Sequence, residues 1–310
     1  MPRITRIGSS EALSSGCVAT IGNFDGVHLG HRRVIDSLAE EGRRLGLPTA
    51  VLVFEPQPRE FFDPDSAPAR LTRLREKVMS LARLPVDQVL VVRFNRDLAD
   101  LPAEQFVRRI LVDRLNVRYL VVGDDFRFGR LRSGDFSYLR LAGEKYGFAV
   151  QDTESVIVDG ERISSTLIRN ALLGDRLDLA ERFLGRPDSM CGRVIPGNQR
   201  GRQLGFPTAN IEVARKIAPL HGVFAVTMRG LGELPLPGVA NIGSRPTVSG
   251  GRQLLLEAHL LDFDQDIYRR RLEVCFHQKL RDERKFADLP ALRDQIERDV
   301  RAARDFFSRC

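Results

Sequence analysis

Short apolar runs alternate with helical periodicities through the first 186 residues of the chain. The runs are typical of strands buried on both faces of a parallel sheet, and they cover residues 17–21, 50–54, 89–94 and 119–122. Two segments between them repeat apolar side chains at helical spacing: Leu74, Val78, Leu81 and Leu84 in one, and Phe106, Ile110 and Leu115 in the other. Alternating strands and helices predict an α/β domain with a doubly wound parallel sheet, in which ligands bind beyond the carboxyl ends of the strands.

The pattern changes after LGRPDSM at residues 184–190. Short strand candidates separated by Gly- and Pro-bearing turns then dominate, at residues 223–228, 238–242, 254–261 and 272–276. A final segment carries Leu292, Ile296, Val300 and Phe307 along one stripe, which predicts a single long helix. We therefore predict two domains, 1–186 and 187–310, the second a small antiparallel β-barrel with a C-terminal helix.

A length of 310 residues with 43% hydrophobic residues suits two ordinary domains. The sequence holds no run near the ~18–20 apolar residues of a membrane helix, and its start resembles no signal peptide, so we expect no membrane partner. The four cysteines, Cys17, Cys191, Cys275 and Cys310, are scattered without a CxxC pair. This spacing argues against a zinc ribbon or a disulfide framework and predicts a reducing, cytoplasmic setting.

The net charge of +7 is compatible with two kinds of partner. Nucleic acid is one, because basic domains neutralise its phosphates; anionic small substrates such as nucleotides are the other. The basic residues are spread through both halves, and only short clusters occur, such as Arg32-Arg33 and residues 269–271. Charge alone does not choose between the two.

The stretch GNFDGVHLGH, residues 22–31, follows the first predicted strand directly. A helix that begins near Val27 or His28 would present free backbone N–H groups where a phosphate could bind. His28 and His31 would share one face of its first turn, and their imidazoles could donate hydrogen bonds to phosphate oxygens. A metal site, which would need a third ligand, and a packed core histidine remain the alternatives.

Four further stretches in this half carry a resemblance. They are FEPQPREFF (54–62), ARLTRLREK (69–77), VVGDDFRFGR (121–130) and ISSTLIR (163–169). Together with GNFDGVHLGH, and in this order, they resemble the FMN adenylyltransferase module of the bifunctional prokaryotic riboflavin kinase/FMN adenylyltransferase (FAD synthetase) family. A lone HxGH signature would also fit pantetheine-phosphate and nicotinate-mononucleotide adenylyltransferases. The four accompanying stretches, which resemble the flavin-specific module, argue against those two enzymes.

The resemblance implies a role for each matching residue. His28 and His31 would be catalytic. Residues that would bind nucleotide or phosphate are Gly22, Asn23, Asp25, Gly30, Ser164, Ser165, Thr166 and Arg169. Residues that would contact the flavin are Phe54, Phe62, Asp125, Phe126 and Phe128. Hydroxyls at a helix start and a bidentate guanidinium suit phosphates, and aromatic rings suit a tricyclic isoalloxazine.

In the second half, GRVIPGNQRGRQLGFPTANIE (192–212) fits neither the P-loop nor the dinucleotide-binding pattern, and generic rules predict a loop and then a strand from near Thr208. Thr208 and Asn210 would alternate onto one face and offer two oxygen ligands suited to Mg²⁺. The stretch LLLEAHLLDF (254–263) likewise places Glu257 and His259 on one face. A glutamate on a strand is most often part of its solvated face.

A second set of stretches resembles the riboflavin kinase module of the same family: GRQLGFPTANI, GVFAV (222–226), GVANIGSRPTV (238–248), LEAHLLDF and KLRDERKF (279–286). The resemblance implies that Thr208 and Asn210 bind Mg²⁺ and ATP, that Gly201, Arg202 and Gly205 bind phosphates, and that Glu257 is the general base for the ribityl 5′-hydroxyl. Departures from the family pattern are Phe224 in place of Tyr, Arg269 in place of Gly, and the missing aromatic after GRP.

The expected function is therefore FAD biosynthesis from riboflavin, with FMN as intermediate, ATP as substrate in both reactions and Mg²⁺ as cofactor. The alternative from another functional class is a nucleic-acid-binding protein with an OB-like barrel. A second alternative is an enzyme in which one of the two modules is inactive. The sequence favours small-molecule partners over nucleic acid and leaves the oligomeric state open.

Overall fold

The structure is a computed structural model that describes residues 2–7, 16–123, 125–197, 204–213, 215, 217–246 and 252–309. The chain forms two compact units. The first comprises residues 1–68 and 72–164, and the second comprises residues 69–71 and 165–310. The domain boundary expected after residue 186 stays a prediction.

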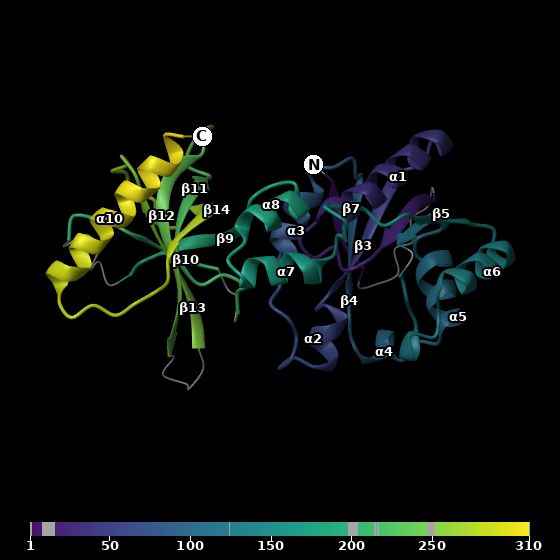
Figure 1. Ribbon diagram of the computed structural model, residues 1–310. Coiled ribbons are helices and arrows are strands. Elements are labelled where there is room, and N and C mark those ends of the chain that lie inside the picture. Colours follow the sequence, from purple (N-terminus) through teal and green to yellow (C-terminus); the bar gives the residue numbers. More distant parts are fainter. Residues whose placement is uncertain are drawn as a thin grey trace. The chain divides into compact units, whose positions relative to one another are not determined.

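The first unit is built on a six-stranded sheet, in which every neighbouring pair of strands is parallel (Figure 1). The strand order is β1-β4-β3-β2-β5-β6. The strands are β1 (Arg3–Ile7), β2 (Cys17–Ile21), β3 (Thr49–Glu55), β4 (Gln88–Arg93), β5 (Val117–Gly123) and β6 (Ala149–Thr153). The predicted doubly wound α/β fold is thus confirmed.

Helices cover both faces of this sheet, because the side chains of a strand alternate between two cores. Val18 of β2 packs with Ile35 and Leu38 of helix α1 (Leu29–Leu45), whereas Cys17 and Ala19 lie in the cluster on the other face. The remaining helical segments of this unit are α2 (Pro58–Phe62), α3 (Leu74–Leu81), α4 (Arg96–Ala99), α5 (Ala103–Phe106), η1 (Val107–Val112), η2 (Arg130–Arg132) and α6 (Phe136–Tyr146). A short hairpin, β7 (Ile157–Val158) with β8 (Glu161–Arg162), follows β6.

Two predicted helices differ in detail from those observed. Helix α3 ends at Leu81, so Leu84 of the predicted stripe lies beyond it. The second begins as α5 but continues as the π-helix η1. This helix ends at Val112, so Leu115 of the predicted stripe lies beyond it, although its side chain is buried.

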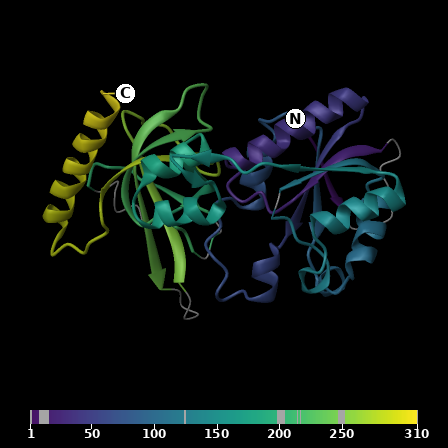
Figure 2. The ribbon, with the colours of Figure 1, turned by 45° about the vertical axis from the view of Figure 1, so that its right-hand side comes forward.

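The second unit is a closed antiparallel barrel with the strand order β10-β13-β12-β11-β14-β9. Its strands are β9 (Asp188–Ile195), β10 (Ala209–Glu212), β11 (Gly222–Arg229), β12 (Leu236–Pro246), β13 (Arg252–Leu260) and β14 (Arg271–Arg281). Two helices precede them, α7 (Ser165–Leu173) and α8 (Leu177–Leu184), and α8 contacts β9 and β14 (Figure 2). The predicted barrel is therefore confirmed.

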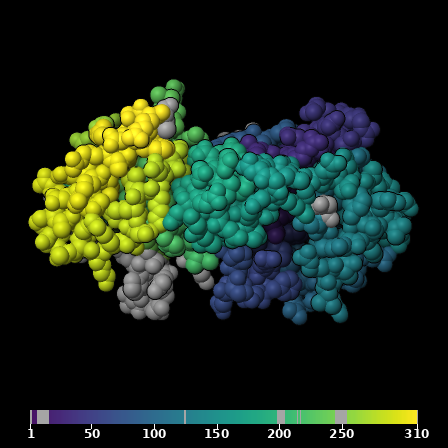
Figure 3. All heavy atoms as spheres, viewed as in Figure 1, coloured from purple at the N-terminus to yellow at the C-terminus, as the bar shows by residue number. Residues whose placement is uncertain are grey.

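The long C-terminal helix α10 (Leu289–Phe307) packs on β11, β12 and β14 and forms an outer layer of this unit (Figure 3). It begins where sequence rules place a helix start, because the Asp288 carboxylate accepts the backbone N–H of Ala291 at 2.8 Å. Inside the barrel, Phe224 and Phe276 meet edge to face with ring centroids 5.5 Å apart. Among the described residues, no helix is both long and apolar enough to cross a membrane.

Candidate active sites

The turn between β2 and α1 is strained and buried. Phe24 and Val27 have positive φ angles of 46° and 45°, and both side chains are buried. A β-branched residue rarely adopts this conformation, which costs about 1–3 kcal/mol. The surrounding core holds the turn in this shape, so the start of α1 has one defined position at the carboxyl end of β2.

His28 and His31 cap α1 reciprocally. His28 is the N-cap residue; its Nδ1 accepts the backbone N–H of His31, and Nδ1 of His31 accepts that of His28, each at 3.3 Å. The two rings stack with centroids 3.6 Å apart. An Nδ1 that accepts carries no proton, so each neutral ring has its proton on Nε2. Both imidazoles are thereby oriented as Nε2–H donors at a helix N-terminus, where backbone dipoles also favour an anion.

Neighbouring residues of the same stretch shape this cap. A Cβ at Gly30 would lie 3.2 Å from the His28 ring, so glycine leaves room for that imidazole. The Gly22 N–H donates to the Leu52 carbonyl at 3.1 Å, and Asn23 is exposed. These positions agree with a backbone that a phosphate could approach closely.

Asp25 contacts Thr72, a residue that the sequence analysis did not single out. Its buried carboxylate accepts the Thr72 N–H at 2.8 Å and the Thr72 hydroxyl at 3.2 Å, and that hydroxyl in turn accepts the N–H of Gly26 at 2.9 Å. These contacts hold the GNFDGVHLGH turn to the ARLTRLREK segment. They favour a role in shaping the turn over direct contact with a phosphate, which a carboxylate would repel.

The ISSTLIR segment begins beside the same cap. The position of a Cβ on Gly30 is 3.9 Å from the carbonyl oxygen of Ile163. Helix α7 starts at Ser165, so Ser165 and Thr166 lie in its first turn and only Ser164 precedes it. Arg169 donates from Nε to the Ala69 carbonyl at 2.6 Å, and both residues belong to the second unit.

The candidate flavin residues divide by exposure. Phe62 is 63% exposed and meets Phe61 and Phe94 edge to face, so its ring is available to a planar ligand. Phe54 and Phe128 are buried in the core of the first unit. Phe126 stacks on Phe128 with a centroid distance of 5.7 Å and is only partly buried.

Asp125 lies close to these rings in the sequence but not in the core. Its side chain is 79% exposed, and its carboxylate lies 3.5 Å from the Arg162 guanidinium. An exposed carboxylate in this position can reach a bound ligand, and its partner Arg162 comes from β8.

In the barrel, Glu257 stands between two asparagines. In the strand register it is opposite Asn210 of β10 on one side and Asn241 of β12 on the other. Directly opposed residues of antiparallel strands project from the same face. Leu256 and Ala258 are buried, so they point into the barrel and the three polar side chains line its other face.

Glycines make room for two members of this row. A Cβ at Gly197 would lie only 1.9 Å from Nδ2 of Asn210, so only glycine lets that side chain take its place. A Cβ at Gly243 would lie 2.4 Å from the Glu283 carboxylate, which accepts Nδ2 of Asn241 at 3.2 Å. Sequence reasoning missed Asn241, because an asparagine in the apolar run GVANIG gives no signal until its strand partner is known.

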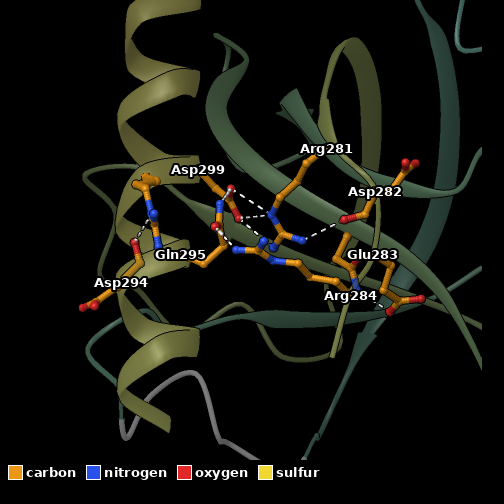
Figure 4. Close-up of polar contacts among 9 residues, drawn as sticks. Arg281, Asp282, Glu283, Arg284, Asp294, Gln295 and Asp299 are labelled. Atoms are coloured by element: carbon orange, nitrogen blue, oxygen red, sulfur yellow. Dashed lines mark hydrogen bonds and ion pairs between the residues drawn. The ribbon is translucent and has the colours of Figure 1, made fainter. Parts of the chain in front are cut away.

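The KLRDERKF segment is fixed to α10. Arg281 at the end of β14 donates to both carboxylate oxygens of Asp299, from Nε at 3.0 Å and from a terminal nitrogen at 2.8 Å, and Gln295 donates to the same carboxylate at 2.8 Å (Figure 4). Arg284 donates to Gln295. These contacts anchor the residues that lead to Glu283.

The remaining predicted kinase residues lie before β10. Thr208 is exposed and precedes Ala209, the first residue of β10, so the strand begins one residue later than predicted. Gly205 has φ of 86°, a turn conformation that favours glycine. Gly201 and Arg202 lie outside the described residues.

Comparisons with known proteins match both units. A family model described as FAD synthetase matches residues 10–167, and one described as riboflavin kinase matches residues 184–307. The chain is 54% identical to the bifunctional riboflavin kinase/FMN adenylyltransferase of Escherichia coli strain K12, over 96% of this chain and 95% of that protein. It is 48% identical to the protein of the same description from Haemophilus influenzae, over 99% of this chain and 100% of that protein.

A solved structure also resembles this one. A crystal structure described as a macrolide-efflux protein from Streptococcus pneumoniae has a TM-score of 0.84 and 28% identity, over 97% of this chain and 98% of that chain. The fold and the two matched models define a chain with two transferase modules. This chain belongs to the family of bifunctional riboflavin kinase/FMN adenylyltransferases.

Proposed function

We propose that the barrel phosphorylates riboflavin to FMN with Glu257 as base, and that the first unit adenylylates FMN to FAD at His28 and His31. Family membership supports the two activities. The observation that carries the assignment of residues is the register of Glu257 with Asn210, since it brings a carboxylate and a ligand-type oxygen to one face of the barrel.

In the kinase step, the Glu257 carboxylate takes the proton of the ribityl 5′-hydroxyl. The hydroxyl oxygen forms a bond to the γ-phosphorus of ATP, the bond from that phosphorus to the bridging oxygen breaks, and ADP leaves with the electron pair. A carboxylate aimed at a bound hydroxyl is chemically sufficient for this transfer. Its neighbours Asn210 and Asn241 fix the strand face on which it acts.

In the adenylyl transfer, a phosphate oxygen of FMN attacks the α-phosphorus of a second ATP, and pyrophosphate leaves. No covalent enzyme intermediate is needed. The Nε2–H groups of His28 and His31 would donate to the oxygens on which charge develops, and the start of α1 adds backbone N–H groups. Ser164, Ser165, Thr166 and Arg169 would hold further phosphate oxygens.

The residues Thr208 and Asn210 fit Mg²⁺, because they offer neutral oxygen donors and this ion commonly takes one or two protein oxygens together with substrate phosphates and water. Among the described residues, no group of three His, Cys, Asp or Glu is placed to hold a metal ion. When bound, Mg²⁺ would neutralise phosphate charge.

We also propose that the exposed Phe62 ring contacts the isoalloxazine and that the enzyme works in the cytoplasm. The scattered cysteines, without a CxxC pair, support the cytoplasmic setting.

A chromatographic time course with purified protein, riboflavin, ATP and Mg²⁺, run beside a reaction that starts from FMN, tests the proposal. FMN first and FAD later is the expected result. FMN without FAD would contradict the adenylyltransferase site, and FAD from FMN alone would contradict the kinase site. Neither product, together with salt-sensitive binding of an oligonucleotide, would favour the nucleic-acid alternative.

A further inference from the structure

His259 follows Glu257 by two residues on β13, on the same face of the strand, and the reactions above give it no role. Its Nδ1 lies 2.9 Å from the carbonyl oxygen of Pro207. A carbonyl oxygen can only accept, so Nδ1 carries a proton and donates it. The ring also meets Phe206 edge to face, with centroids 5.5 Å apart and planes at 84°.

The contact joins the chain to β13 beyond the end of the backbone ladder. Pairing of β10 with β13 ends at Ala209 opposite Ala258. Two residues before Ala209 is Pro207, which has no N–H and cannot extend the ladder. The imidazole of His259 therefore fixes the backbone at the point where it enters β10, immediately before Thr208.

We propose that His259 is a positioning residue of the kinase site, which holds the 206–208 segment so that the Thr208 and Asn210 oxygens face Mg·ATP. This inference rests on the proposed role of those two residues. In this proposal, one face of β13 carries two functional residues at neighbouring positions. Glu257 takes the proton of the acceptor hydroxyl, and His259 positions the residues that bind Mg·ATP. The spacing between base and phosphoryl donor is then determined by a single strand.

The test compares His259→Leu, which removes the donor, with His259→Asn, whose side-chain amide can still donate to Pro207. In the full-length chain without ligands, hydrogen–deuterium exchange of a peptide spanning residues 204–213 should be faster in His259→Leu and near that of the unaltered chain in His259→Asn. In the riboflavin kinase assay, His259→Leu should raise the KM for Mg·ATP about tenfold, the equivalent of one lost hydrogen bond, and change the KM for riboflavin far less.

His277→Leu is the matched control, since it removes another barrel imidazole that contacts Thr227, Phe306 and Phe307. It should leave exchange in 204–213 and the KM for Mg·ATP unchanged. The proposal is overturned if His259→Leu leaves both readouts unchanged, if it raises both KM values equally, or if His259→Asn fails to restore them. Asn210→Ala separates this from the proposed function: an unchanged KM for Mg·ATP there would contradict the nucleotide role of Asn210 itself.

Discussion

Glu257 and Asn210 are direct partners in the antiparallel register of β13 and β10, although 46 residues separate them in the chain. Opposed side chains in such a pair have Cβ atoms about 4.5–5.5 Å apart. A carboxylate and an amide oxygen at that separation can serve the two ends of one phosphoryl transfer. The closed barrel keeps this distance fixed, because neither strand has a free edge.

Glu257→Gln should lower kcat for riboflavin phosphorylation about 10²–10⁴-fold, the contribution of a general base. FMN supplied directly should still be adenylylated at the normal rate. Steady-state assays of each half-reaction check this. Glu273→Gln on β14, where the Glu273 carboxylate accepts the Ser189 hydroxyl at 3.0 Å, is the matched control. Near-normal riboflavin turnover in Glu257→Gln would show that another group takes the proton.

His28→Asn and His31→Asn separate capping from catalysis. Asparagine keeps an oxygen that can accept the backbone N–H at the start of α1, whereas alanine loses about 0.5–2 kcal/mol of capping at an N-cap position. FAD synthesis from FMN should fall about 10²–10³-fold in the His28→Asn variant, because a donor to the developing charge is lost. Thermal unfolding should shift less in His28→Asn than in His28→Ala, and riboflavin phosphorylation should persist in both. Full FAD synthesis in the double asparagine variant would refute a catalytic role for the pair.

Asp299→Ala should destabilise the barrel by about 3–5 kcal/mol, the usual cost of removing one partner from a buried ion pair. The Asp299 and Arg281 side chains are only 6% and 20% exposed. Asp262→Ala is the control, because Asp262 pairs with Arg304 of the same helix, and water screens this pair, whose side chains are 72% and 49% exposed. Denaturant unfolding monitored on the barrel should show a large shift for the first variant and little for the second.

His277 makes the stability of the barrel dependent on pH. Burial, and then the nearby Arg229 charge, lower the pKa of His277 from its usual 6.5. As the pH falls below about 6.5, the unfolded chain takes up a proton that the folded chain does not, so the free energy of unfolding decreases until the lower folded-state pKa is reached. Calorimetric scans at pH 7.5 and 5.5 should show this loss, and His277→Gln should reduce it. An equal pH dependence in that variant would assign the effect to other groups.

Strands buried on both faces were predictable from sequence, because β2, β3 and β4 are continuous apolar runs. Edge strands were not: β1 reads RITRI and β6 reads AVQDT, neither of which is a continuous apolar run, and each pairs on one side only. The strand β9, DSMCGRVI, was missed because polar residues and a glycine likewise interrupt its apolar residues. In each of these three strands, pairing with a neighbouring strand determines the conformation. The local sequence pattern carries no information about that neighbour.

The candidate sites show the same division. The His28–His31 pair follows from local spacing on a helix, so the sequence was enough to place both rings together. The Asp25–Thr72 contact and the row that ends at Asn241 depend on pairing between distant segments. Sequence motifs relate residues that are close along the chain, so they could not predict these contacts between distant segments.

Residues 69–71 belong to the barrel unit, although they lie within the sequence of the first unit. The carbonyls of Arg70 and Leu71 accept the buried Arg215 guanidinium at 2.9 and 3.2 Å, and Ala69 accepts Arg169. A gene fragment that starts at residue 187 would encode every barrel strand yet omit residues 69–71, whose carbonyls accept these hydrogen bonds from Arg215. Recombination at a single point between the two modules therefore separates residues 69–71 from the unit to which they belong.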